Sequence, residues 1–256
     1  MEFLTSADGT RIAYEIGGTG RPIVFATGAF NDHTAAAELA ERLAGTFTVV
    51  TYDRRARGRS GDTRPYAIER EVDDLAALID LVGGESAVFG YSSGALLAVY
   101  AAAAKAPITH LALYEAPYAM RGRSEQTDLP RRLDDLVRQD RPGDAVALFQ
   151  TEGIGLPPET VAQIRQSPMF PSLAAIAQST VYDATITAAF ATPDPALTGV
   201  DVPALVMNGA ETWPGLAQAA RALADALPRG RYQEIPGGAD HGIPVEATAD
   251  AIRSFC

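Results

Sequence analysis

The first 116 residues alternate between short apolar runs and longer segments in which apolar residues recur every three or four positions. Continuous apolar runs predict strands buried on both faces of a parallel sheet, and the longer period predicts helices that pack on it. The expected strands are 3–5, 11–16, 22–26, 46–52, 86–89 and 109–114, and the expected helices are 34–43, 68–81 and 95–105. This alternation predicts an α/β fold with a mostly parallel sheet flanked by helices.

The alternation breaks between residues 117 and 195. This segment holds no convincing core strand, only helix-like pieces at 130–139, 143–150, 158–166 and 173–179. Strands then return at 203–208 and 231–235, with helices at 215–227 and 245–255. We therefore expect a core domain made of residues 1–116 and 196–256. We also expect residues 117–195 to form a helical cap over the carboxyl edge of the sheet, where α/β proteins bind ligands.

The pentapeptide Gly90-Tyr91-Ser92-Ser93-Gly94 lies between an expected strand and an expected helix. A strand-to-helix turn of the form G-x-S-x-G presents its serine outward, because the glycines let strand and helix approach closely. The simpler alternative is a helix start capped by Ser92. The strand–turn–helix context favours an exposed nucleophilic serine.

Composition narrows the classes of partner. The net charge is −11, so nucleic acid is not expected to bind. The arginine-rich stretch 54–59 indicates either a phosphate site or a solvated loop in which one arginine holds a carboxylate, and we favour the loop. No apolar run approaches the roughly 18 residues that span a bilayer, so a membrane partner is not expected either.

Metal and disulfide chemistry are also not expected. The three histidines are scattered, and the single cysteine is Cys256, so no zinc-ligand spacing and no internal disulfide can be formed. The first residues show no basic segment followed by an apolar one, which favours a cytoplasmic location. We expect a small-molecule substrate and no cofactor, and the sequence does not indicate an oligomeric state.

Three features together resemble the α/β-hydrolase family. They are the pentapeptide 90–94, the segment 52–60 (similar to the D-x-R-G-x-G-x-S loop common in that family) and His241 near the end of the chain. The resemblance covers nearly the whole length. It implies the expected fold with a helical cap, but members include esterases, lactonases, peptidases, epoxide hydrolases, dehalogenases and non-enzymatic receptors, so the fold does not select a substrate.

The resemblance implies a nucleophile and a base. Ser92 takes the place of the nucleophile, and a serine suits attack on a carbonyl that leads to an acyl-enzyme. A serine hydroxyl needs a base to accept its proton, and the family supplies a histidine between the last strand and the last helix. His241 lies there, whereas His110 begins a strand at the opposite edge and His33 follows the third strand.

The acid has two candidates. The commonest family position follows the strand 203–208, where Glu211 lies one residue early and Thr212 occupies the expected place. Some dehalogenases and lipases instead carry the acid at the end of the preceding strand, and Glu115 matches that position. A glutamate that ends an apolar strand also needs a partner for its charge. We favour Glu115 over Glu211, and over Asp240, which is adjacent to the histidine.

The oxyanion hole is expected to use two backbone N–H groups, those of Ser93 and Ala29. The family usually shows H-G-x after the third strand, and Thr27 replaces that histidine here while Gly28 is retained. Candidate pocket residues are large apolar or aromatic side chains, each of which could equally be plain core. They are Phe30, Tyr91, Tyr118, Met120, Phe149, Met169, Phe170, Tyr182 and Trp213.

The favoured function is therefore a cofactor-free serine hydrolase that cleaves a small or medium ester, lactone or thioester through an acyl-enzyme on Ser92. One alternative keeps the pocket and changes the outcome, as in a cyclase, an acyltransferase or an epoxide-opening enzyme. A second alternative is a ligand receptor with little turnover.

Overall fold

Eight strands form one sheet in the computed structural model, which describes residues 1–120, 128–192, 197 and 199–256. The strand order is β1-β2-β4-β3-β5-β6-β7-β8, and every pairing from β4 to β8 is parallel. The bounds are β1 Glu2–Thr5, β2 Arg11–Gly18, β3 Arg21–Ala26, β4 Phe47–Tyr52, β5 Ser86–Tyr91, β6 Ile108–Tyr114, β7 Ala204–Gly209 and β8 Gly230–Ile235. The expected mostly parallel sheet is confirmed.

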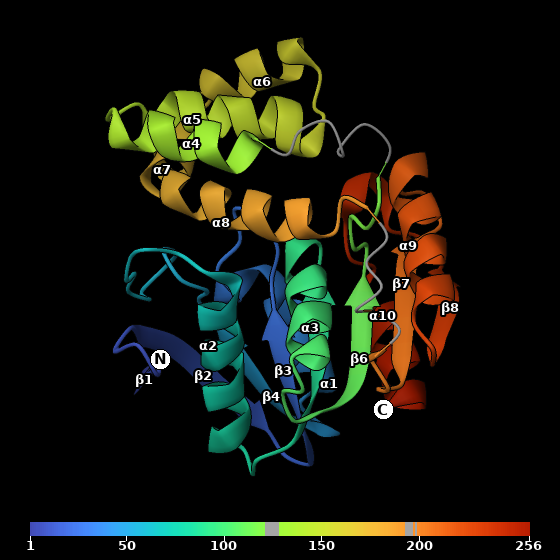
Figure 1. The fold of residues 1–256 in the computed structure, drawn as a ribbon. Helices are drawn as coiled ribbons and strands as arrows, with labels where there is room; N and C mark the ends of the chain where they lie inside the picture. Colours follow the sequence, from blue (N-terminus) through green and yellow to red (C-terminus); the bar gives the residue numbers. More distant parts are fainter. Residues whose placement is uncertain (121–127, 193–196, 198) are drawn as a thin grey trace.

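Helices cover both faces of this sheet (Figure 1). One face packs against α2 (Ile68–Leu81), α3 (Ser93–Ala103) and α9 (Pro214–Ala226), and the other packs against α1 (Ala37–Leu43) and α10 (Val245–Phe255). Successive side chains of β3 belong to opposite faces, with Val24 in one core and Phe25 in the other, both fully buried. Burial on both faces is why the central strands are continuous apolar runs.

The segment between β6 and β7 is helical among the described residues. It contains α4 (Leu129–Arg138), α5 (Pro142–Leu148), a π-helical turn (Phe149–Ile154), α6 (Pro158–Arg165), α7 (Phe170–Ala175) and α8 (Ala177–Ala189). Figure 1 shows these helices together beyond the carboxyl ends of the parallel strands, with α8 nearest the sheet. They share a small core of their own. The expected boundary between residues 195 and 196 lies outside the described residues.

Helix α8 differs from the expected piece at 173–179. α7 ends at Ala175, and α8 starts at Ala177 and continues to Ala189. Polar residues of α8 are buried together with its apolar ones, Thr180 and Asp183 both being fully buried. A helix enclosed on most sides has no apolar stripe with a polar face opposite, so its period does not stand out in the sequence. No described helix is long and apolar enough to cross a membrane.

Candidate active site

A strained turn at Ser92 joins β5 to α3. Ser92 has φ 56° and ψ −124°, a conformation rare for a residue with a side chain. Strand β5 and helix α3 come so close that a Cβ at Gly90 would lie 2.5 Å from Ala95 Cα, and a Cβ at Gly94 would lie 2.1 Å from the carbonyl oxygen of Ala26 at the end of β3. These are the features expected of a turn that presents a serine at the carboxyl edge of the sheet.

His241 and Glu115 are brought together from segments 126 residues apart. Glu115 directly follows β6, is fully buried, and its Oε2 is hydrogen-bonded to His241 Nδ1. Its other oxygen accepts a hydrogen bond from the backbone N–H of Gly209 at 3.0 Å. An ionised carboxylate can only accept, so Nδ1 carries the proton and Nε2 of the neutral ring has a free lone pair.

The alternatives lie elsewhere. Glu211 is exposed, and its side chain has no hydrogen bond or ion pair within the part of the chain that the structure describes. His33 pairs instead with the buried Asp53, the Nδ1–Oδ1 distance being 2.7 Å. Asp53 also accepts from the backbone N–H of Arg59 at 2.7 Å, so it closes the loop after β4. His110 packs edge-on against Phe255.

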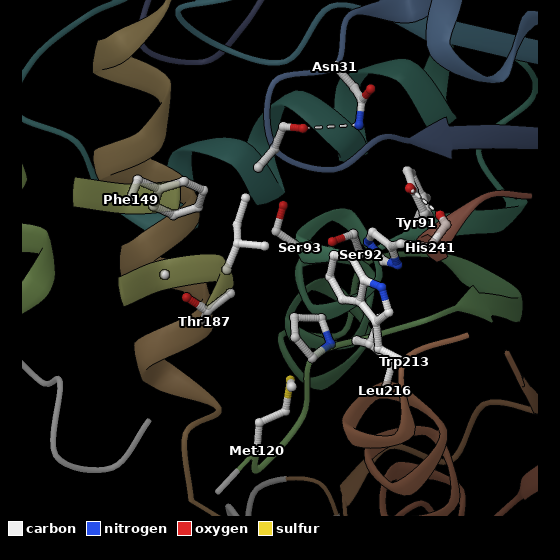
Figure 2. Close-up of a pocket in the computed structure, with 14 residues that line it drawn as sticks. Asn31, Tyr91, Ser92, Ser93, Met120, Phe149, Thr187, Trp213, Leu216 and His241 are labelled. Carbon is white, nitrogen blue, oxygen red and sulfur yellow. Dashed lines mark hydrogen bonds between the residues drawn. The ribbon is translucent and has the colours of Figure 1, made fainter. Parts of the chain in front are cut away.

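Two tyrosine hydroxyls hold the loop that carries the histidine. Tyr91 donates to the carbonyl oxygen of His241 at 2.7 Å (Figure 2), and Tyr114 donates to that of Gly242 at 2.8 Å. The ring of Trp213 lies nearly parallel to the imidazole, with centroids 5.8 Å apart. The imidazole is therefore restrained by its backbone, by a carboxylate and by a neighbouring ring.

The loop after β3 lies directly against Ser92. A Cβ at Gly28 would lie 2.7 Å from Ser92 Cβ, so only glycine permits this approach. The Ala29 and Ser93 N–H groups have no acceptor among the described residues. Asn31 Nδ2 donates to the carbonyl oxygen of Ala29 at 3.0 Å and stabilises the turn (Figure 2). Ser92 Oγ itself makes no hydrogen bond to a described residue, and such contacts commonly tighten only when substrate binds.

A cavity of about 100 Å³ lies over Ser92 and His241. Its other lining residues are mostly apolar (Figure 2): Ala29, Asn31, Tyr91, Ser93, Pro117, Met120, Phe149, Gly153, Ile154, Thr187, Trp213 and Leu216. Four expected pocket residues are among them, namely Tyr91, Met120, Phe149 and Trp213. The sequence did not predict four of the lining residues, namely Asn31, Ile154, Thr187 and Leu216. The packing of separate elements against one another places them at the cavity, and no local sequence pattern indicates this.

Phe30, Tyr118 and Tyr182 do not line this cavity, contrary to expectation. Phe30 packs edge-on behind Phe149, with ring centroids 5.6 Å apart. Tyr118 is buried in the core beside the sheet. Tyr182 stacks on Tyr66, and its hydroxyl donates to Asp62.

The remaining two candidates also lie outside the cavity. Met169 is exposed, and Phe170 packs against the core of the helices between β6 and β7. These five side chains pack in the core beside the sheet, pack between helices or remain on the surface, as the plainer interpretation of apolar residues predicts.

The arginine-rich loop is not solvated as expected. Arg54, Arg55 and Arg57 are at most 2% exposed, and each forms ion pairs with buried carboxylates, whereas Arg59 is exposed. The sequence shows four arginines close together but not the carboxylates that pair with them, which come from α2, α8 and, as Asp8, the turn between β1 and β2. One arginine was expected to pair with a carboxylate, and three arginines of this loop do so.

Comparison with known proteins gives a consistent result. A model of the alpha/beta hydrolase family matches residues 23–254. An alpha/beta hydrolase from Sphaerobacter thermophilus is 43% identical, with 99% of each chain covered and a TM-score of 0.89. A thermophilic esterase from Thermogutta terrifontis is 26% identical, with 99% of this chain and 97% of that chain covered and a TM-score of 0.77.

A shorter match is to the uncharacterized hydrolase YraK of Bacillus subtilis. It is 37% identical over 93 residues, which is 35% of this chain and 34% of that protein. The family match over almost the whole chain agrees with the sheet order, the strained turn at Ser92 and the close approach of Gly28. This chain therefore belongs to the α/β-hydrolase family.

Proposed function

We propose that the protein is a serine hydrolase that cleaves a small, uncharged ester, lactone or thioester through an acyl-enzyme on Ser92. The hydrogen bond between Glu115 and His241 carries the proposal, because His241 and Ser92 line one cavity. A buried carboxylate on Nδ1 leaves Nε2 as the proton acceptor, which is the arrangement that activates a serine.

The reaction follows from these positions. Ser92 Oγ attacks the carbonyl carbon of the substrate while His241 Nε2 accepts the hydroxyl proton. The N–H groups of Ala29 and Ser93 stabilise the oxyanion that forms. The carbon–oxygen or carbon–sulfur bond of the substrate then breaks, and His241 returns the proton to the leaving group. Water cleaves the acyl-enzyme by the same steps in reverse order, and Glu115 holds the imidazole throughout.

The cavity supports a short acyl group. Its volume of about 100 Å³ is less than the roughly 150 Å³ that holds one benzene molecule in an engineered protein cavity. Met120, Trp213 and Leu216 form apolar walls, and the only titrating imidazole or carboxylate among the described lining residues is that of His241. Such walls favour an uncharged, compact acyl group.

Labelling with a fluorophosphonate and turnover of p-nitrophenyl esters from acetate to octanoate test this proposal. We expect one labelled residue, Ser92, and a kcat/KM that is highest for acetate to butyrate. Ser92→Ala should abolish labelling and turnover, and Ser254→Ala, an exposed serine on α10, should change neither. Labelling that persists in the alanine variant would contradict the mechanism. Labelling at Ser92 without turnover of any ester would favour the receptor or the non-hydrolytic alternative.

A further inference from the structure

Four buried charged side chains from three separate segments form one cluster, which we call the charge cluster. Its members are Arg54 and Arg57 from the loop after β4, Glu71 from α2, and Asp183 from α8, and each is at most 2% exposed. Arg54 pairs with Glu71 at 2.7 Å and with Asp183 at 3.0 Å. Arg57 Nη2 lies 2.7 and 2.8 Å from the two oxygens of Asp183.

The charge cluster holds two positive and two negative groups. Burial alone would raise the pKa of Asp183, but the charges of Arg57 and Arg54 outweigh it and lower that pKa below its ordinary value. The pKa of Glu71 is lowered in the same way by Arg54 against the effect of burial. Both carboxylates are therefore ionised at neutral pH. Removing one of them would leave an arginine charge buried without a counter-charge.

The two arginines of the charge cluster also bind the loop after β3. Arg57 Nη1 donates to the carbonyl oxygen of Gly28 at 2.6 Å, and Arg54 Nη1 donates to that of Thr27 at 3.1 Å. The carbonyl of Gly28 and the N–H of Ala29 belong to one peptide group. In a planar trans peptide these two bonds point in opposite directions, so the bond from Arg57 sets the direction of the Ala29 N–H.

Asp183 also contacts Ser93, the residue that carries the second expected oxyanion donor. Ser93 Oγ donates to Asp183 Oδ1 at 2.7 Å and accepts a weaker bond from Arg54 at 3.4 Å. The side chain of Ser93 is thereby tied to the same carboxylate that holds Arg57. Asp183 on α8 therefore contacts both Arg57, which orients the Ala29 N–H, and Ser93, which carries the other free N–H.

We infer that Asp183 is a positioning residue, through which α8 holds the Ala29 and Ser93 N–H groups in the geometry that stabilises the oxyanion. The inference rests on the proposed function, since it assigns a purpose to the charge cluster within that reaction. Asp183 does not line the cavity, so its loss should act on the transition state and not on substrate binding.

The test is Asp183→Asn, which keeps the shape of the side chain and removes its charge. Loss of one oxyanion donor costs about 10²–10³ in kcat, so a displaced pair should cost tenfold or more, with KM within about threefold of wild type. The Ki of a trifluoromethyl ketone, which binds as a tetrahedral oxyanion, should rise by the same factor as kcat/KM falls.

Asp74→Asn is the matched control. Asp74 is equally buried on α2 and pairs with Arg55 at 2.5 Å, but within the described part of the chain it forms no hydrogen bond or ion pair with the loop after β3 or with Ser93. Its kcat should stay within about twofold of wild type. Assays are made well below the melting temperature of each variant, which separates loss of folding from loss of positioning.

Arg57→Lys provides a second variant, because Asp183→Asn removes a buried charge and can prevent folding. Lysine keeps the charge but cannot bind Gly28 and both oxygens of Asp183 together. It should also lower kcat tenfold or more with KM unchanged. Wild-type kcat in either folded variant, or equal losses in the Asp74→Asn control, would overturn the inference. Failure of the proposed function is recognised separately. In that case the wild-type enzyme is not labelled at Ser92, and the Ser92→Ala variant keeps its turnover.

Discussion

Tyr91 and Tyr114 are register partners on the adjacent parallel strands β5 and β6, and their hydroxyls hold the carbonyl oxygens of consecutive residues, His241 and Gly242. Each tyrosine directly precedes a residue of the proposed triad, Ser92 or Glu115. The histidine loop needs such support, because His241 has φ 70°, a conformation that costs energy for a residue with a side chain. The two strands that carry the nucleophile and the acid thus also fix the base.

We therefore expect the Tyr91→Phe and Tyr114→Phe variants each to lower kcat by about threefold to tenfold, since a hydrogen bond contributes about 0.5–1.5 kcal/mol. The double variant should lower it further, because the loop then has neither support. Steady-state kinetics on one ester measure this, with Tyr232→Phe on β8 as the control. A double variant with wild-type kcat would show that the loop holds its conformation without the tyrosines.

Glu115→Gln should be far more damaging than Glu211→Gln. The amide keeps the shape of the side chain but cannot stabilise the imidazolium, and loss of the orienting acid in a triad costs about 10⁴ in kcat. Glu211 is exposed, so its change should remain within about tenfold. Measuring kcat for both variants decides the assignment, and the reverse order of effects would move the acid to the loop after β7.

Gly28→Ala should abolish most activity while the fold survives. Its Cβ would lie 2.7 Å from Ser92 Cβ and 3.1 Å from the Tyr91 carbonyl oxygen, so the loop after β3 must move away from the nucleophile. We expect a loss of about 10² in kcat or more, because a shift of about 1 Å in reacting groups costs that much. Gly45→Ala is the control, since no atom lies within 4 Å of its added Cβ. Equal kcat in both variants would contradict the proposed role of the loop.

The charge cluster should make the free energy of unfolding depend on pH in the acid range. The pKa of Asp183 is lower in the folded protein than its ordinary value of 3.8, so its contribution to folding is present above pH 4 and is lost as the pH falls through the folded value. An amide at this position does not titrate. The free energy of unfolding, measured with urea at pH 7, 5, 4 and 3, should therefore differ most between wild type and Asp183→Asn at pH 7 and converge below pH 4. A difference that stays constant down to pH 3 would show that Asp183 is not the titrating group.

The parts of the fold that follow from local pattern were predicted well. The strands of the sheet centre are apolar on both faces, so the run at 22–26 predicts β3 with little ambiguity. Helix α8 was missed because its buried polar residues remove the helical period. The same enclosure hid Asp183, whose partner Arg57 lies 126 residues away in the chain.

The candidate active site shows the same difference between residues that a local pattern predicts and residues that depend on contacts between elements. Glu115 could be predicted because a glutamate that ends an apolar strand needs a partner, and His241 supplies one. The sequence could not show whether Phe30 and Tyr182 line the cavity. A large apolar residue packs equally well between helices and on the helix surface that faces the cavity. Only the contacts between helices and sheet decide which of the two occurs.

The position of Glu115 directly after β6 has an evolutionary consequence. On the proposed assignment the loop after β7 does not supply the acid, so residues 210–213 are free of that constraint. Trp213 in this loop nevertheless forms a wall of the cavity. A lineage with this arrangement can vary the loop, except where Trp213 lies against the imidazole of His241, and so change which acyl groups fit while the acid is kept. Substrate range can then change without loss of the acid, which makes this loop the natural place for new specificities to arise.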